Sequence, residues 1–541
     1  MRAAWGTVLA LLLAGCLTAP APPGPGSGTD AAFLDTGWAE RALPMAHDHA
    51  DPALHANLTT PNFQVVGWDP LVSPTYGTSV PGTLCGDVVE REGRRIAAIQ
   101  ARNDIVAIIA DVTDPAKPVF LGELVMRTTY VYDVAAVADG LHIAVVTTLP
   151  RQPDQPPLAA PAPGSVDVSA ALDAPSDEGL WWRSACIPGL GWQKLRAQVP
   201  GEDYVPHPDQ LVLVSIADPS QPQVVDEVPL GGYGHSVSSA KVGDRVVVAA
   251  AAMGPLPVGV PGYDLSAYSQ NFHFYEVIAG PTGGKLVPLS VWTPPPPLGA
   301  EALHGASGHD DVWISEHPGV HQTLAYIAAG DLGLYILDFS DPTQPKLLGR
   351  WTDFDPVRPN DSGSFHSVYA MPTLWEDGKH YTLVGPEFGG RPVDNPTGVV
   401  RVLDTTDPTQ PHEVAAWTLP YDTTWEEFLQ FSTHYLRVVG HTLFVSCYHA
   451  GIWAIDLRDL GKQPWLNLPS VGVFLAYQPS PTPPAHPLRW APTFEEVLAF
   501  PDGTMLTYES NTGVYVFRYD EARPMPAPKP WPLEPAKVAS A

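Results

Sequence analysis

Gly330-Asp-Leu-Gly-Leu-Tyr-Ile-Leu-Asp-Phe-Ser-Asp-Pro-Thr-Gln-Pro-Lys-Leu-Leu-Gly-Arg-Trp351 is the stretch of this 541-residue sequence that decides the fold. Apolar and β-branched residues over 334–339 and 346–351 predict two strands, and the polar residues between them predict a tight turn. The carboxyl group of Asp341 can accept a hydrogen bond from the backbone of the turn, and Pro342 fixes φ at its first corner. Pro345 excludes a helix, so the chain must reverse into an antiparallel neighbour.

The same strand–turn–strand unit occurs three more times, at 108–122, 212–225 and 400–414. Each copy has an Asp-Pro-x-x-Pro turn between two apolar runs. A recurring all-β unit of this kind is typical of propellers and solenoids, in which neighbouring units bury each other's apolar faces. The 62 prolines, and the lack of long segments with helical periodicity, agree with short strands joined by many turns.

The Asp-Pro-x-x-Pro turn between two β runs resembles that of the LVIVP-repeat family, bacterial and archaeal surface proteins built as β-propellers. The resemblance covers most of the chain after residue 60. It implies the propeller fold and a cell-surface location, and it implies little about activity.

The strand pattern predicts a β-propeller of seven four-stranded blades. A lone strand at 62–69 has no inner strands before it, and three strands between 496 and 517 have no fourth. We therefore expect the N-terminal strand to complete the last blade, which protects the sheet edges. The predicted inner strands begin near Asp87, Asp133, His235, His309, His366, His434 and Glu496.

The N-terminus is predicted to be a targeting segment. Arg2 precedes a short apolar run, and Leu13-Ala-Gly-Cys16 resembles a bacterial lipobox, in which Cys16 becomes the lipidated (palmitate-type) first residue. The expected organisation is a signal peptide (1–15), a lipidated tether and N-terminal arm (16–60), the propeller (61–520) and a proline-rich tail (521–541). Because Leu17 is not the aspartate associated with inner-membrane retention, we expect an outer-membrane lipoprotein outside the cytoplasm.

The net charge of −29 argues against nucleic acid as a partner, because the surface would repel phosphates. The expected partner is a surface protein, a glycan or a small molecule. No nucleophile elbow, P-loop, His-Glu-x-x-His helix or dinucleotide-binding fingerprint occurs in the sequence.

Three cysteines remain after Cys16. Cys447 lies in a strongly apolar run and is expected in the core. Cys85 and Cys186 are the candidate disulfide in an oxidising compartment, and the alternative is that they do not pair.

Three blades carry insertions between their second and third strands, at 151–207, 254–270 and 386–392. In a propeller these loops leave from the face at which the inner strands begin. Long loops gathered on one face commonly build a binding surface. The alternative is loop length without function, because a longer surface loop is tolerated at little energetic cost.

Four of the inner strands begin with histidine, in consecutive blades: His235, His309, His366 and His434. Around the channel mouth these imidazoles would hold one metal ion (Fe, Cu or Mn), with Asp87, Asp133 and Glu496 accepting their ring N–H groups or lining the channel. Carotenoid-cleaving oxygenases hold axial iron with four histidines, a resemblance in placement alone. The carboxylates also permit calcium, a less favoured ion, and His304 is an alternative to His309.

The alternative for this group is scaffold, with each His or Asp bonding the neighbouring blade. Tyr448 and His449 are expected to be scaffold residues. His47, His49 and His55 are expected to belong to a polar N-terminal arm, and metal binding by this cluster is the alternative. We therefore expect a lipid-anchored binding module that acts through its loop-bearing face. The alternative is a metal-dependent oxidoreductase with a four-histidine axial site, and the sequence leaves open whether the protein is an enzyme.

Overall fold

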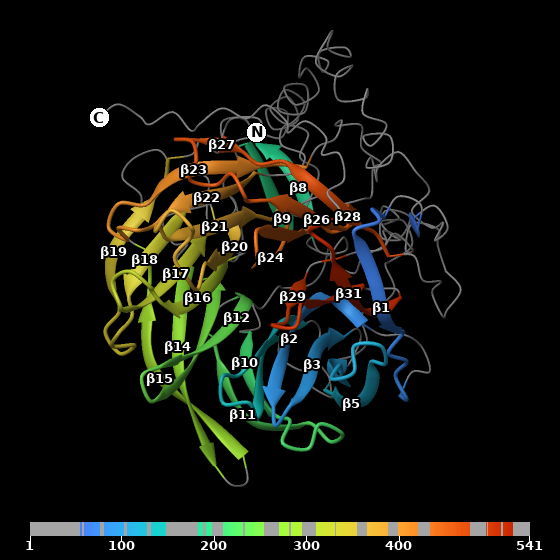
Figure 1. The fold of residues 1–541 in the computed structure, drawn as a ribbon. Helices are drawn as coiled ribbons and strands as arrows, with labels where there is room; N and C mark the ends of the chain where they lie inside the picture. Colours follow the sequence, from blue (N-terminus) through green and yellow to red (C-terminus); the bar gives the residue numbers. More distant parts are fainter. Residues whose placement is uncertain are drawn as a thin grey trace, which may run out of the picture.

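The structure is a computed structural model in which every regular element of the blades is a strand (Figure 1). It describes residues 55–56, 59–75, 81–101, 105–126, 131–147, 182–187, 191–196, 209–230, 233–253, 270–280, 283–294, 310–330, 332–353, 365–387, 399–419, 433–476, 494, 496–509 and 512–522. Among these residues, no helix is long and apolar enough to cross a membrane.

The strands form seven blades around a central axis, as predicted (Figure 1). Blade one contains β2 (Pro81–Arg91), β3 (Arg94–Ala101), β4 (Ile105–Asp111) and β5 (Val119–Val125). Blade two contains β6 (Val131–Ala136), β7 (His142–Thr147), β10 (Gln210–Ser215) and β11 (Gln223–Pro229). Blade three contains β12 (Tyr233–Val242), β13 (Arg245–Met253), β14 (Gln270–Gly280) and β15 (Gly283–Trp292). Blade four contains β16 (Asp310–Glu316), β17 (Thr323–Ala329), β18 (Leu334–Asp338) and β19 (Lys346–Trp351).

The remaining three blades complete the ring. Blade five contains β20 (Phe365–Ala370), β21 (Tyr381–Pro386), β22 (Val400–Asp404) and β23 (His412–Trp417), and β27 (Leu466–Asn467) pairs with β23 in parallel. Blade six contains β24 (Leu436–Val439), β25 (Thr442–Ser446), β26 (Ile452–Asp456) and β28 (Ser470–Phe474). Blade seven contains β29 (Val497–Ala499), β30 (Thr504–Glu509), β31 (Gly513–Tyr519) and β1 (Phe63–Asp69).

Blade seven is closed by the N-terminal strand, as expected from the unmatched strands at the two ends of the sequence. β1 pairs antiparallel with β31, so the outer strand of the last blade comes from the start of the chain (Figure 1). The residues just before β1 also fasten blade six. Thr60 exchanges hydrogen bonds with Val473 of β28, and the Asn62 side chain donates to the Val471 carbonyl at 2.8 Å.

The apolar core of the described residues is divided into layers between neighbouring blades. In the layer between blades three and four, for example, the rings of Phe274 and Phe339 pack with centroids 4.6 Å apart. The middle strands are buried on both faces, which explains why they are apolar throughout instead of alternating.

The Asp-Pro turns fold as the sequence predicts, and each docks on the preceding blade. The Asp341 carboxylate accepts hydrogen bonds from the Thr343 N–H at 3.0 Å and the Thr343 hydroxyl at 2.7 Å. The corresponding turn of blade five lies against Gly349 of β19, where an added Cβ would stand 2.2 Å from the Pro408 carbonyl oxygen. Gly67 and Gly122 face the next turn in the same way. The glycine of the repeat therefore leaves the space into which the Asp-Pro turn of the next blade packs. This glycine position is called the socket below.

Gly349→Val is expected to lower the free energy of unfolding by about 2–3 kcal/mol, because the turn of blade five must move to admit the side chain. Leu347→Ala on the same strand is the control: Leu347 is 41% exposed, so the change should stay within about 0.5 kcal/mol. Urea denaturation of both variants measures the difference. Equal stability of the two variants would contradict the socket.

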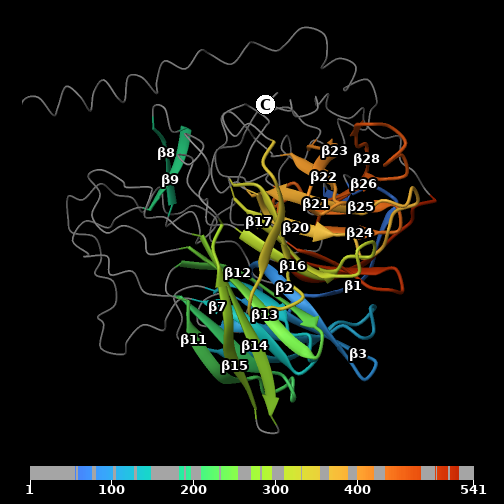
Figure 2. The same cartoon turned by 90° about the vertical axis from the view of Figure 1, so that its left-hand side faces the viewer.

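The two ends of the propeller differ in their connections. At one end the strands are joined by short turns, such as Glu92-Gly93 in blade one and the Asp-Pro turns. At the other end lie the three predicted insertions and the links to the next inner strand, and this end is called the loop face below. The first insertion contains a strand pair absent from the sequence prediction, β8 (Trp182–Ile187) with β9 (Gly191–Arg196) (Figure 2).

Candidate functional site at the channel mouth

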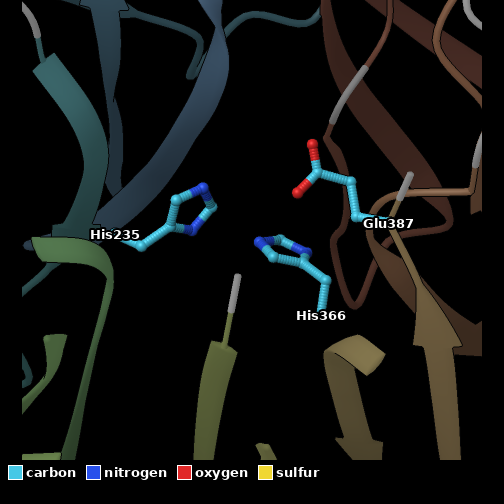
Figure 3. A group of neighbouring side chains, drawn as sticks. All are labelled: His235, His366 and Glu387. Carbon is cyan, nitrogen blue, oxygen red and sulfur yellow. The ribbon is translucent and has the colours of Figure 1, made fainter. Parts of the chain in front are cut away.

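Three side chains converge where the inner strands begin, at the centre of the loop face (Figure 3). His235 comes from β12, His366 from β20, and Glu387 follows the end of β21. One ligating atom from each residue lies within 4.8 Å of the other two. His366 and Glu387 are buried, and His235 is half-buried.

β-Bulges position the two imidazoles. The antiparallel register shifts between Gly234 and Val237 in β12, and between Phe365 and Ser367 in β20. A bulge adds one residue to a strand and changes the direction of its side chain. The irregular segments contain His235 and His366, and Figure 3 shows both rings directed into one space with the Glu387 carboxylate beside them.

Aromatic side chains surround this group. The ring centroid of His366 lies 5.2 Å from that of His235 and 4.3 Å from that of His434. The Tyr435 ring packs edge-on against both His366 and His434. The Tyr448 hydroxyl donates a hydrogen bond to Glu387 Oε1, and Tyr448 has a φ of +44°. A positive φ is uncommon for a non-glycine residue, and the expectation that Tyr448 is a scaffold residue stays a prediction.

The acidic residues of the inner strands occupy a different position from the histidines. Each accepts a hydrogen bond from the backbone N–H of the residue after it, at 2.7, 2.7, 2.7 and 3.0 Å for Asp87, Asp133, Asp311 and Glu496. The second oxygen of Asp87 accepts from Ala136 and that of Asp133 from Val237, each in the next blade, at 3.0 and 2.8 Å. These bonds are those of an inter-blade scaffold.

The histidines and the acids were expected to occupy the same position at the start of each inner strand. In the structure, the histidines stand one residue before the position of the acids. Ser236 and Ser367, which directly follow His235 and His366, take the place that the acids hold in other blades, because each precedes the valine that continues the inner strand. The bulges of blades three and five thus direct His235 and His366, the residues before this place, into one space at the channel mouth. Asp87, Asp133 and Glu496 bond backbone N–H groups, and their role in supporting the imidazoles or lining the channel stays a prediction.

A cation from blade six lies among these carboxylates. The pKa of Arg437 in β24 is raised, because the attraction of Glu496 and Asp87 outweighs the opposing effect of burial. Its guanidinium also lies over the rings of Trp313 and Tyr369, 5.2 and 5.7 Å from their centroids. Arg437 is therefore the counter-ion of the inner-strand acids, which are called the acidic ring below (Asp87, Asp133, Asp311 and Glu496). This role was not predicted from the sequence.

Burial raises the pKa of two of the acids towards neutrality. Desolvation raises the pKa of Asp133 to about 7, and the nearby carboxylates of Asp311 and Asp87 raise it further against the Val237 hydrogen bond. Desolvation raises the pKa of Asp311 to about 6, with Arg437 acting in the opposite direction. Asp133 also accepts a hydrogen bond from the Tyr435 hydroxyl at 3.4 Å, which connects the acidic ring to the aromatic side chains beside His366.

The free energy of unfolding is expected to fall as pH rises from 5 to 7. An unfolded aspartate ionises near pH 4, whereas the folded pKa values of Asp133 and Asp311 are about 7 and about 6. The protonated carboxyls therefore stabilise the folded protein fully below about pH 4. This contribution is lost as pH rises through the folded pKa values. Asp133→Asn should remove about 1 kcal/mol per pH unit of this slope. Urea denaturation at several pH values measures it, and an unchanged slope in the variant would contradict the assignment.

Several predicted residues lie outside the described part of the chain: His309, His304, His47, His49 and Cys16. Cys186 lies in β8, whose side chains are also outside it, so the Cys85–Cys186 disulfide stays a prediction. Cys447 is fully buried, as expected. His55 is buried against blade six, where its Nδ1 lies 2.6 Å from the Ala476 carbonyl oxygen, away from any predicted ligand set.

Comparisons with known proteins match solved structures and one family model. No curated protein matches the chain. The crystal structure of Saccharomyces cerevisiae Sqt1 is similar with 10% identity and a TM-score of 0.43, over 82% of this chain and 98% of that one. A functionally unknown protein from Desulfotomaculum acetoxidans DSM 771 is similar with 10% identity and a TM-score of 0.36, over 67% and 79%.

One family model matches, described as the LVIVD repeat, over residues 310–353. These residues are blade four, which contains the stretch from which the fold was predicted. The expected resemblance to this repeat family is thus confirmed over blade four, under the name LVIVD in place of LVIVP. With its seven blades, this chain is a β-propeller that carries the LVIVD repeat.

Proposed function

We propose that this chain is a binding module of the cell envelope, held by a lipid on Cys16, whose ligand contacts the loop face. The observation that carries the proposal is that the predicted insertions leave from the same face at whose centre His235, His366 and Glu387 converge. Loops on a rigid scaffold are the usual location of binding residues. The partner class is a surface protein, a glycan or a small molecule, and the net charge of −29 disfavours nucleic acid.

A pair of positions on blade four tests this proposal. Asp353 is exposed at the loop face, and Gln344 is exposed in the Asp-Pro turn at the opposite end. A photo-crosslinking amino acid placed at residue 353 is expected to give a discrete product on intact cells, and one at residue 344 is not. Replacing residues 151–207 by a short linker should abolish that product. Equal products from both positions, or a product insensitive to the deletion, would overturn the proposal.

Cys16→Ser is expected to move the protein from the membrane fraction to the soluble fraction, because acyl chains on Cys16 supply the membrane affinity. Fractionation of cells followed by immunoblotting measures the shift, and mass spectrometry of the wild-type N-terminal peptide checks for the acyl groups. Retention of the serine variant in the membrane fraction would contradict the lipid anchor.

A second candidate function is that of a metal-dependent oxidoreductase, and the site His235, His366 and Glu387 favours it specifically. Two imidazoles and one carboxylate with open coordination positions are typical of non-haem iron oxygenases. The four-histidine site expected from the sequence is replaced in this candidate by the three-residue set. Oxygen uptake by the iron-loaded protein, absent in Glu387→Gln, would support it. No uptake with any of a panel of oxidisable small molecules would leave the binding module as the function.

A further inference from the structure

We infer that His235, His366 and Glu387 bind one divalent transition-metal ion on the propeller axis at the loop face (Figure 3). The inference goes beyond the proposed binding module, which needs no metal, and it supplies the metal site on which the second candidate function rests. It also differs from the four-histidine expectation, since its oxygen ligand comes from the root of an insertion.

The distances allow an ion with small side-chain adjustments. Nitrogen and oxygen ligands lie about 2.0–2.2 Å from such a metal, so two ligands of one ion are separated by no more than about 4.4 Å. The donor atoms of the three residues already lie within 4.8 Å of one another. The side-chain torsions of the three residues allow an adjustment of this size.

The donor types select a class of ion. Imidazole nitrogens suit zinc, iron, copper and nickel, whereas calcium and magnesium require shells made of oxygen. The set contains two imidazoles and one carboxylate, with no thiolate. A set of three protein ligands leaves at least one coordination position for water or a ligand, as in catalytic metal sites. The half-buried His235 marks the side from which solvent reaches the site.

Neighbouring side chains hold the three residues in place before any ion binds. The Tyr448 hydroxyl donates a hydrogen bond to Oε1 of Glu387, which fixes the orientation of that carboxylate. Both histidines lie on inner strands, and the His434 and Tyr435 rings pack against His366. Hydrogen-bonded neighbours that orient ligands are a regular feature of metal sites. His434 lies outside the set that converges on one point and acts as a packing partner of His366.

Metal titration of the full chain without its signal peptide, stripped with chelator and carrying Cys16→Ser, tests the inference. Co²⁺ absorption and Zn²⁺ calorimetry are expected to show one equivalent bound. His366→Ala and the isosteric Glu387→Gln should each weaken binding at least about 100-fold, and Tyr448→Phe about 10-fold. His412→Ala is the control, because that side chain is 61% exposed and remote in sequence from the set, and its affinity should equal that of the wild type.

Absence of stoichiometric binding in the folded wild type would overturn the inference, and so would affinity that both Glu387→Gln and His366→Ala leave intact. Urea denaturation of each variant establishes that it is folded, and Glu387→Gln keeps the test valid should His366→Ala unfold. The loop-face function is judged separately, by the cross-linking product at residue 353 with and without chelator. That product persisting while no metal binds would reject the ion and keep the binding module.

Discussion

A chain that lacks residues 1–69 is expected not to fold. The deletion removes β1, and with it the strand that pairs with β31 along its whole length. The exposed edge of β31 would be a template for aggregation. The deletion also removes Phe63, which is buried at 6% exposure. Burial of a phenylalanine side chain alone contributes about 3–5 kcal/mol to the free energy of unfolding. Whole domains have a free energy of unfolding of only about 5–15 kcal/mol. The deletion removes the strand, the Phe63 contacts and the Thr60 and Asn62 bonds to blade six, and we expect this combined loss to exceed the stability of the propeller.

Circular dichroism and size-exclusion chromatography of the deletion measure this outcome. A chain that begins at His55 is the control, because it keeps every described contact of the N-terminal segment, and it should unfold at the same urea concentration as the longer chain. A monomeric deletion variant with cooperative unfolding would contradict closure of the ring by β1.

Arg437→Met is expected to lower the free energy of unfolding by about 3 kcal/mol at pH 7, because removal of one partner leaves buried charges uncompensated. Glu496 is 3% exposed and Asp311 6% exposed, so water cannot replace the guanidinium. The loss should shrink as pH falls towards 5. The variant raises the folded pKa of these carboxyls further above the unfolded value, which destabilises the protein only where the unfolded chain is ionised.

Urea denaturation of Arg437→Met at pH 5 and pH 7 gives both numbers. Arg458→Met is the matched control: its guanidinium pairs with Asp456 at 2.6 Å, but the side chain is 51% exposed, so its removal should cost no more than about 1 kcal/mol at either pH. A loss of unfolding free energy in Arg437→Met that is small, or the same at both pH values, would show that Arg437 is not the counter-ion of the acidic ring.

The fold could be predicted from the sequence because its determinants are local. An Asp-Pro-x-x-Pro turn encodes its own hydrogen bonds, as Asp341 and Thr343 show, and unmatched strands at the two ends leave ring closure as the simple solution. The role of Gly349 as a socket could not be predicted in this way, because its partner Pro408 lies in the next blade.

The candidate site could be predicted only in part. His235, His366 and His434 come together because they begin inner strands, which the repeat reveals. Glu387 belongs to an insertion outside the repeat, so no periodicity identifies it. The bulges that direct the imidazoles leave no clear sequence signal, which is why the acids and histidines were assigned to one position. Arg437 had a signal: an arginine between the apolar residues of an inner strand, within a ring of acids that requires a counter-ion.

The central claim is that the channel mouth at the loop face is the functional centre of this propeller. Anomalous diffraction from crystals of the chelator-treated protein, soaked in Zn²⁺ and recorded on both sides of the zinc absorption edge, tests it most directly. We expect one strong peak within coordination distance of His235, His366 and Glu387, absent in crystals of Glu387→Gln. A peak elsewhere, or no peak between these residues in well-ordered crystals, would contradict it.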